Sequence, residues 1–190
     1  MNTLSEGVTL SEGATLSEGV TLSQGATLSE GATAKIMVDP SDSNYVYKIY
    51  KKKQTQKNDP QVEIEIHYEI AEHLTEEMSD LGVAVPSFIV DSQGRYRMRR
   101  IDTSKPMWEE DVWASLSANL QKEYLWRARI FLKSLAAYGI FLKDVEAYIQ
   151  TNTDTIMFID FGQAYRGAPT TTFHLESAAV LPYSITKDWA

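Results

Sequence analysis

The residues best suited to chemistry lie at the two ends of one stretch, residues 139–162, which carries Asp144 near its start and Asp160 near its end. Between them, residues 147–150 and 155–159 have the composition of two short strands around a turn at 151–154. Such a hairpin folds the chain back, so we expect both carboxylates to face one site. Two carboxylates placed in this way suit phosphoryl transfer, one beside the attacking hydroxyl and one on a metal ion.

A third chemically suggestive residue, Lys48, lies inside a predicted strand, residues 44–50. Alternation places Val46, Lys48 and Tyr50 on one face of this strand. One interpretation is an edge-strand lysine that blocks aggregation. The other is a phosphate-binding lysine beneath the glycine turn around Gly31. The strand by itself does not decide between them.

The elements that must position these residues follow from periodicity. We expect a helix over residues 60–79 whose apolar stripe is Ile66, Ile70, Leu74 and Met78. Further elements are predicted along the chain: a hairpin of strands 83–90 and 95–101, a short helix at 108–116, and a long helix over 119–138 that Gly139 ends. In the hairpin, Arg95, Arg97 and Arg99 alternate onto one face, which we interpret as solvated.

Composition restricts the classes of protein that remain. The 190 residues suggest one domain, or one domain with a tail, and the absence of cysteine excludes disulfides, thiolate zinc sites and cysteine catalysis. A net charge of −8 argues against nucleic-acid binding through phosphates. No apolar run is long enough for a transmembrane helix, so none is expected.

A hexapeptide repeat occupies residues 3–33, as TLSEGV, TLSEGA, TLSEGV, TLSQGA and TLSEGA. A β-helix of such coils is one possibility, but five copies bury little apolar surface. We therefore expect residues 1–26 to form a mobile tail, rich in Ser, Thr, Glu and Gly. The last copy, residues 27–32, runs directly into the folded domain, for which we predict the boundaries 27–190.

Taken in order, these features resemble the protein-kinase fold. Leu142-Lys143-Asp144 falls where kinases carry His-Arg-Asp, and the FIDFG segment that contains Asp160 matches the family's metal-binding segment. Val46-Tyr47-Lys48 falls where the phosphate-binding lysine follows an apolar strand. The resemblance implies an α+β, protein-kinase-like fold with a complete N-lobe at about 27–101 and a strongly reduced C-lobe at about 102–190.

The loop and strand EGATAKI…YVYKIY, together with the lack of an Ala-Pro-Glu segment after Gly162, are similar to the small OspG-like effector kinases of bacterial type III secretion. The nearest resemblance is to those that phosphorylate the host 90-kDa heat-shock chaperone. It implies a monomeric serine/threonine kinase that bacteria secrete into the host cytoplasm, where it acts on a host protein. Because no activation loop is recognised, we expect constitutive activity.

The resemblance also assigns roles. Asp144 orients and deprotonates the substrate hydroxyl, Asp160 holds Mg²⁺, and Lys48 binds the α- and β-phosphates of ATP. A glutamate of helix 60–79 holds Lys48, and we expect Glu69, with Glu63 next. The backbone N–H at Gly31 covers the phosphates, and residues 98–101 meet adenine. The residues assigned to nucleotide binding are Ser29, Gly31, Ala34, Val46, Lys48, Glu69, Met98 and Arg100.

One position departs from the family pattern. The metal-binding Asn expected five residues after Asp144 is Ile149, which cannot coordinate a metal. Glu146, Gln150 or Asn152 must replace it, and we expect Gln150 to do so. This departure favours one alternative, a pseudokinase that binds a host partner. A small-molecule kinase of the aminoglycoside type, which usually needs a large helical C-lobe, and a repeat-based structural protein are further alternatives.

Overall fold

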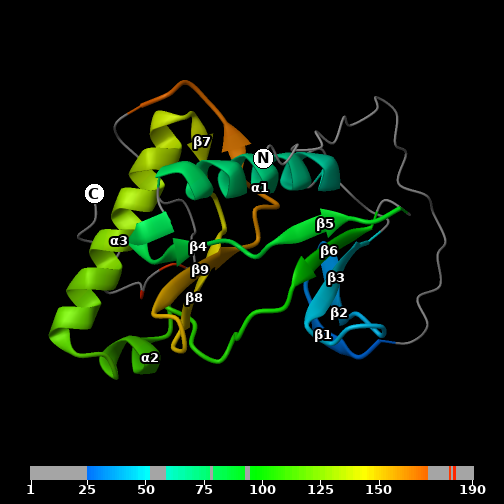
Figure 1. Ribbon diagram of the computed structural model, residues 1–190, viewed down its shortest axis with the longest axis horizontal. Coiled ribbons are helices and arrows are strands. Elements are labelled where there is room, and N and C mark those ends of the chain that lie inside the picture. The colour runs from blue at the N-terminus through cyan, green and yellow to red at the C-terminus, as the bar shows by residue number, and fades with distance from the viewer. Residues whose placement is uncertain are drawn as a thin grey trace, which may run out of the picture.

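A five-stranded antiparallel sheet forms one lobe of the α+β fold (Figure 1). The computed structural model describes residues 25–51, 59–77, 79–92, 95–170, 180 and 182. The strands of this sheet are, in spatial order, β1 (Thr27–Glu30), β2 (Ala34–Val38), β3 (Tyr45–Tyr50), β6 (Tyr96–Arg99) and β5 (Phe88–Val90). Lys48 lies opposite Ile36 on one side and Tyr96 on the other, so it belongs to a central strand. The edge-strand interpretation of Lys48 is therefore wrong.

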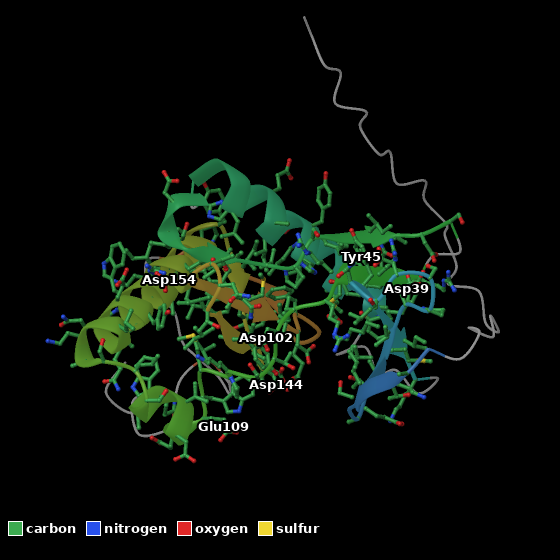
Figure 2. All side chains as sticks on the ribbon, turned by 60° about the horizontal axis from the view of Figure 1, so that its bottom comes forward. Asp39, Tyr45, Asp102, Glu109, Asp144 and Asp154 are labelled. Atoms are coloured by element: carbon green, nitrogen blue, oxygen red, sulfur yellow. The ribbon has the colours of Figure 1, made fainter. Side chains whose placement is uncertain are left out.

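The second lobe contains two smaller sheets. One has the order β4 (Val83–Ala84), β9 (Thr155–Ile159) and β8 (Glu146–Gln150), and the other pairs β10 (Tyr165–Arg166) with β7 (Ile140–Phe141). The predicted hairpin of β8 and β9 is confirmed, with Gln150 opposite Thr155 at the turn and Glu146 opposite Ile159 at the open end. Asp144, labelled in Figure 2, precedes β8 by two residues and Asp160 follows β9 directly, so the two candidate carboxylates flank that open end.

The prediction of one hairpin over residues 83–101 is only half right. β5 and β6 do pair as a hairpin, but β4 pairs in parallel with β9, Val83 opposite Ile156. Pro86 lies between β4 and β5 and has no N–H to donate to a ladder. The chain leaves one sheet here and enters the other, so residues 83–90 link the two lobes.

The helix α1 (Pro60–Glu77) begins at an aspartate cap. Asp59 Oδ1 accepts the backbone N–H of Gln61 at 2.9 Å, and Pro60 takes the first helical position, where its missing N–H costs nothing. Ile66, Ile70 and Leu74 are buried, as the apolar stripe predicts. Met78, the last residue of the predicted stripe, lies outside the described residues.

The core that α1 helps to build lies mostly in the second lobe. It joins α1 to α3 (Ala118–Ala137) and to the β8–β9 hairpin, where the rings of Phe131 and Phe158 lie 4.5 Å apart. A shorter helix, α2 (Glu110–Ala114), and a 3₁₀ turn, η1 (Ser79–Leu81), complete the helical elements among the described residues. Because this core holds the base of the hairpin, it fixes where Asp144 and Asp160 emerge.

The end of α3 follows the predicted glycine stop. Gly139 has φ +78°, a left-handed conformation that favours glycine, and its N–H donates to Ala136 O at 3.0 Å. A Cβ at this position would come within 2.5 Å of the backbone oxygen of Gly167. Gly139 is therefore required both by its backbone conformation and by the close approach of residue 167.

Most of the repeat segment, residues 1–24, lies outside the described residues, so the predicted tail stays a prediction. The last copy does enter the fold. Its residues 27–30 form β1, which pairs with β2 with Glu30 opposite Lys35, and Val38 N–H donates to Ala26 O of the preceding copy at 2.9 Å. Among the described residues, no helix combines the length and apolarity that crossing a membrane requires.

Candidate active site

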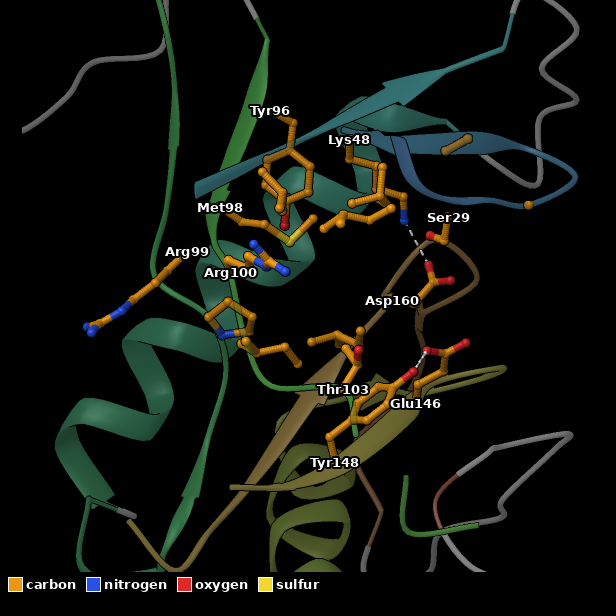
Figure 3. Close-up of a pocket in the computed structure, with 18 of the residues that line it drawn as sticks. Ser29, Lys48, Tyr96, Met98, Arg99, Arg100, Thr103, Glu146, Tyr148 and Asp160 are labelled. Atoms are coloured by element: carbon orange, nitrogen blue, oxygen red, sulfur yellow. Dashed lines mark hydrogen bonds and ion pairs between the residues drawn. The ribbon is translucent and has the colours of Figure 1, made fainter. Parts of the chain in front are cut away.

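A cleft of about 1010 Å³ separates the two lobes (Figure 3). The five-stranded sheet forms one wall, and the β8–β9 hairpin forms the other. Most of the residues assigned from the sequence do line it: Ser29, Gly31, Ala34, Val46, Lys48, Met98, Arg100 and Asp160. Glu69 and Gln150 are not among the lining residues. Figure 2 shows Asp102 and Asp144 between the sheet that carries Asp39 and the lobe that carries Asp154.

Lys48 is the centre of a buried ionic network. Its Nζ lies 2.6 Å from Glu63 Oε1 and 2.8 Å from Asp160 Oδ1, and both Lys48 and Glu63 are buried. Burial alone lowers the pKa of the ammonium, but the fields of the two carboxylates outweigh it and raise the pKa of Lys48 above its ordinary value. Lys48 is therefore a fixed positive charge at the floor of the cleft.

Glu63, and not Glu69, is the partner of Lys48, so our first choice was wrong and our second was right. Glu63 precedes Ile66 and Ile70 by three and seven residues, which places it on the buried stripe of α1. Glu69 faces elsewhere and pairs with Arg166 Nη2 at 2.6 Å. The phase of the stripe was the signal that could have identified Glu63.

Both oxygens of Glu63 are occupied. Tyr50 Oη donates to Glu63 Oε2 at 2.8 Å, while Oε1 faces Lys48. Gly162 packs against the same carboxylate, since a Cβ there would lie 3.1 Å from Oε2. Tyr50 was predicted to share a face with Lys48 but was given no role. In the structure it positions the glutamate that holds the lysine.

A column of rings fixes the segment after Asp160. Phe161 is buried and lies 4.9 Å from the His67 ring, which stacks at 4.3 Å on Phe88 of β5. Burial lowers the pKa of His67 to about 3, so the ring is neutral at physiological pH. Asp160 itself has φ +63°, a conformation uncommon for a non-glycine residue. The column holds this strained residue at the cleft.

Asp144 occupies an exposed loop between β7 and β8, also with a positive φ, +56°. Its Oδ2 accepts a hydrogen bond from Gln163 Nε2 at 2.6 Å. Gln163 follows Asp160 by three residues, so the bond ties the two carboxylate loops together. Asp144 does not line the cleft but lies two residues before Glu146, which does. A carboxylate held there is accessible to a hydroxyl that approaches from solvent.

The structure does not bring Gln150 to Asp160, so that prediction of a metal ligand is wrong. Gln150 lies at the turn end of β8, where its side-chain amide accepts from Asp102 N at 3.1 Å and donates to Asp102 O at 2.8 Å. Ile149 is buried in the core. The reason is register: β8 already begins at Glu146, so the loop after Asp144 is too short to place residue 149 or 150 near the cleft.

Glu146 is the residue that the short loop does place there. Its carboxylate lines the cleft and accepts from Tyr148 Oη at 2.7 Å (Figure 3). Burial, and then the nearby charges of Asp160 and Asp144, raise the pKa of Glu146. Glu146 lies opposite Ile159, the residue before Asp160, so the two acidic side chains are neighbours across the hairpin. The sequence analysis considered Glu146 as an alternative but did not choose it.

The donor set fits a magnesium ion that arrives with a nucleotide. Asp160 and Glu146 supply carboxylate oxygens, and Mg²⁺ is commonly bound by one or two carboxylates together with substrate phosphates. No group of three or more His, Cys, Asp or Glu side chains that could hold a metal by themselves occurs in the described part of the chain. The residues present therefore fit an ion shared with phosphates.

The predicted glycine loop is only partly as expected. Ser29, Gly31 and Ala34 line the cleft, but the N–H of Gly31 donates to Ala34 O at 2.9 Å and does not point at a phosphate site. A Cβ on Gly31 would meet nothing nearer than Ala34 O at 3.8 Å. The turn between β1 and β2 closes on itself in this structure.

Among solved structures, the chain is similar to a kinase from the Cydia pomonella granulovirus, PK-1, with 13% identity and a TM-score of 0.49, covering 75% of this chain and 51% of that one. It is also similar to Rio2 kinase from Chaetomium thermophilum, in an ADP/Mg²⁺-phosphoaspartate complex (19%, TM-score 0.44, coverage 73% and 47%). An ADP-bound aminoglycoside phosphotransferase, APH(2'')-Ib, matches at 17% identity and a TM-score of 0.41 (coverage 62% and 36%).

These matches concern the fold alone, and the chain spans about half or less of each of the three proteins. No family model matches the sequence, and neither does any curated protein.

Proposed function

We propose that this chain transfers the γ-phosphoryl group of a nucleoside triphosphate to a hydroxyl group. One observation carries the proposal: the buried Lys48 Nζ lies 2.6 Å from Glu63 and 2.8 Å from Asp160 at the floor of a cleft between two lobes. A buried lysine with two carboxylate partners, in a cleft with further acidic groups, is the arrangement that phosphate binding with a metal ion requires.

Each residue has a distinct task in the reaction. Lys48 Nζ donates to the α- and β-phosphate oxygens, and Glu63 keeps it in place. Asp160 and Glu146 would hold Mg²⁺, which would neutralise charge on the phosphates. Asp144 accepts the proton of the acceptor hydroxyl as its oxygen attacks the γ-phosphorus. The bond from the γ-phosphorus to the bridging oxygen breaks, and the nucleoside diphosphate leaves.

The resemblance to small effector kinases extends the proposal to its substrates. By that resemblance a nucleoside triphosphate, ATP in those kinases, is the phosphoryl donor, and a serine or threonine of a host protein, such as the 90-kDa heat-shock chaperone, is the acceptor. A bacterial effector that reaches the host cytoplasm and acts there as a monomer fits this resemblance. Phosphoamino-acid analysis of the labelled product tests the acceptor, since labelled tyrosine alone would contradict it.

One observation favours a second candidate, a pseudokinase that binds a partner without transfer. The position expected to hold the second metal ligand, Ile149, is part of the core. If Glu146 does not replace it, the cleft binds nucleotide without turning it over. Binding of nucleotide by the wild-type chain, with no transfer under any metal condition, distinguishes this candidate from the first.

Transfer from γ-labelled ATP and γ-labelled GTP to a eukaryotic cell lysate tests the proposal. We expect a labelled band with the wild-type chain that is absent with Asp160→Asn. Asp154→Asn is a matched control, because Asp154 also has a positive φ, +49°, but lies at the β8–β9 turn away from the cleft. Equal labelling by the wild type and Asp160→Asn would overturn the proposed function.

A further inference from the structure

Arg100 lines the cleft and has no task in the phosphoryl-transfer step. It follows β6 directly and continues the alternation of that strand, so that it lies on the same face as Tyr96 and Met98. Tyr96 is opposite Lys48 and Met98 is opposite Val46. Figure 3 shows the Arg100 guanidinium directed into the cleft, while the side chain of Arg99 extends away from it.

Arg100 differs from Arg95 and Arg97 of the same hairpin in having no side-chain partner; Arg99 also has none among the described residues, but its side chain extends away from the cleft. Arg95 pairs with Asp91 at 2.6 Å and Arg97 with Asp39 at 2.6 Å, both beside tyrosine rings on the opposite face of the sheet. Among the described residues, the guanidinium of Arg100 makes no hydrogen bond or ion pair. Its planar set of N–H donors is available to a ligand.

The position of Arg100 relative to Lys48 indicates which part of a nucleotide it meets. Arg100 lies four positions beyond Tyr96, the cross-strand neighbour of Lys48, which corresponds to about 13 Å along a strand. A nucleotide whose phosphates lie at Lys48 therefore extends its base toward Arg100. Val46, which is opposite Met98, and Ile159 line the cleft and supply apolar surface for a purine ring.

The backbone beside Arg100 has few donors left for a base. Three of the four N–H groups from Arg99 to Asp102 already donate within the protein: Arg99 to Ser87 O at 2.8 Å, Arg100 to Asn44 O at 2.7 Å and Asp102 to Gln150 Oε1 at 3.1 Å. The side-chain amide of Gln150 also donates a hydrogen bond to the carbonyl oxygen of Asp102. Of the four N–H groups, only that of Ile101 has no acceptor among the described residues, so the guanidinium of Arg100 is one of the free donors at this end of the cleft.

From this arrangement we infer that Arg100 reads the base, and that the cleft prefers guanine nucleotides over adenine nucleotides. Arginine donates two parallel hydrogen bonds to O6 and N7 of guanine, both of which are acceptors. Adenine presents an acceptor at N7 but an N–H₂ donor at the neighbouring position, which faces the arginine donors unfavourably. The inference rests on the proposed function, since it assumes that the phosphates lie at Lys48.

Binding of nucleoside diphosphates, which have no γ-phosphoryl group to transfer, tests the inference. Titration calorimetry with Mg²⁺ gives the Kd of the full chain for GDP, IDP and ADP. IDP keeps O6 and N7 of guanine but lacks its amino group, so it isolates the edge that Arg100 contacts. We expect GDP and IDP to bind about 5- to 150-fold more tightly than ADP, the range of a bidentate arginine–guanine contact.

Two variants complete the experiment. Arg100→Ala removes the preference for GDP and IDP over ADP, and its circular dichroism spectrum, compared with that of the wild type, shows that the variant is folded. Arg99→Ala, the neighbouring arginine directed away from the cleft, keeps the preference. Either of two results overturns the inference alone. One is that ADP binds the wild type as tightly as GDP does, and the other is that Arg100→Ala keeps the preference for GDP and IDP over ADP. Failure of the wild type to bind any of the three overturns the proposed function and the inference with it.

Discussion

Glu63 and Gly162 are in direct contact across the cleft floor: a Cβ on Gly162 would lie 3.1 Å from Glu63 Oε2. The two residues belong to α1 and to the segment after β9, which are separated by almost a hundred residues of sequence. Because Glu63 holds Lys48, and Asp160 lies two residues before Gly162, this contact links the helix, Lys48 and Asp160. A substitution that displaces one of these residues is therefore expected to displace the others.

Gly162→Ala is expected to displace the carboxylate of Glu63 by a few tenths of an ångström and to weaken the network around Lys48. We expect phosphoryl transfer to fall by at least about tenfold, which corresponds to about 1.4 kcal/mol at the transition state. Initial rates of transfer, compared at equal folded fraction, check this. An unchanged rate would mean that Glu63 can move without consequence for Lys48.

Glu63→Gln is expected to abolish most of the activity, because it removes the charge that holds Lys48. Removing one member of a buried ion pair typically costs about 3–5 kcal/mol, though Asp160 remains as a second partner here. Glu69→Gln is the matched control on the same helix. It breaks only the exposed pair with Arg166, which contributes about 1 kcal/mol or less. Equal losses of activity in the two variants would contradict our assignment of Glu63.

Glu146→Gln tests the second metal ligand. The variant keeps the size of the side chain and a hydrogen-bond acceptor for Tyr148 but loses a charged oxygen ligand. We expect the Mg²⁺ concentration for half-maximal nucleotide binding to rise by about tenfold or more. Gln150→Ala should leave this concentration unchanged, since Gln150 contacts Asp102 and not the cleft. If Gln150→Ala raises this concentration and Glu146→Gln does not, Gln150 and not Glu146 is the metal ligand.

The effect of Asp154→Asn on stability depends on pH, and the sign of that dependence follows from the partners of Asp154. The hydrogen bond from Tyr124, and then the field of Arg127, lower the pKa of Asp154. Its contribution to stability is therefore present above the unfolded-state pKa of about 3.9 and is lost as pH falls through the lower folded-state value. The side chain is half exposed, so we expect a loss of about 1 kcal/mol or less at pH 7, shrinking below about pH 4.

Urea denaturation of the wild type and Asp154→Asn at pH 7 and pH 3 measures this difference. Asparagine tolerates the positive φ of residue 154 as well as aspartate does, so the substitution tests charge and not backbone strain. A difference in unfolding free energy that grows toward acid pH would contradict the account.

The elements of the fold could be predicted because their patterns are local. The stripe of α1, the glycine stop at Gly139 and the hairpin around residues 151–154 all follow from periodicity and turn residues. The parallel pairing of β4 with β9 could not be predicted, because it joins strands about seventy residues apart and β4 has only two residues. Nothing in a two-residue segment specifies its partner.

The candidate site was predictable where motif and spacing decide, at Lys48, Asp144 and Asp160. The site was not predictable where the register of the β8 strand or the phase of the α1 helix decides which residue faces the cleft. The position of Glu146 depends on β8 starting two residues after Asp144, and counting five residues from Asp144 led instead to Ile149 and Gln150. The partner of Lys48 depends on the phase of α1, which Asp59 and Pro60 set at its start. The closed turn at Gly31 is a tertiary outcome that the residue types do not encode.

The most direct test of the central claim is phosphoryl transfer from γ-labelled nucleotide, measured side by side for the wild type, Asp160→Asn, Asp144→Asn and Asp154→Asn. The account predicts transfer by the wild type and by Asp154→Asn, and a loss of at least about a hundredfold, or 2.7 kcal/mol, in each of the other two. Transfer that survives in both Asp160→Asn and Asp144→Asn would contradict the claim that these carboxylates perform the reaction.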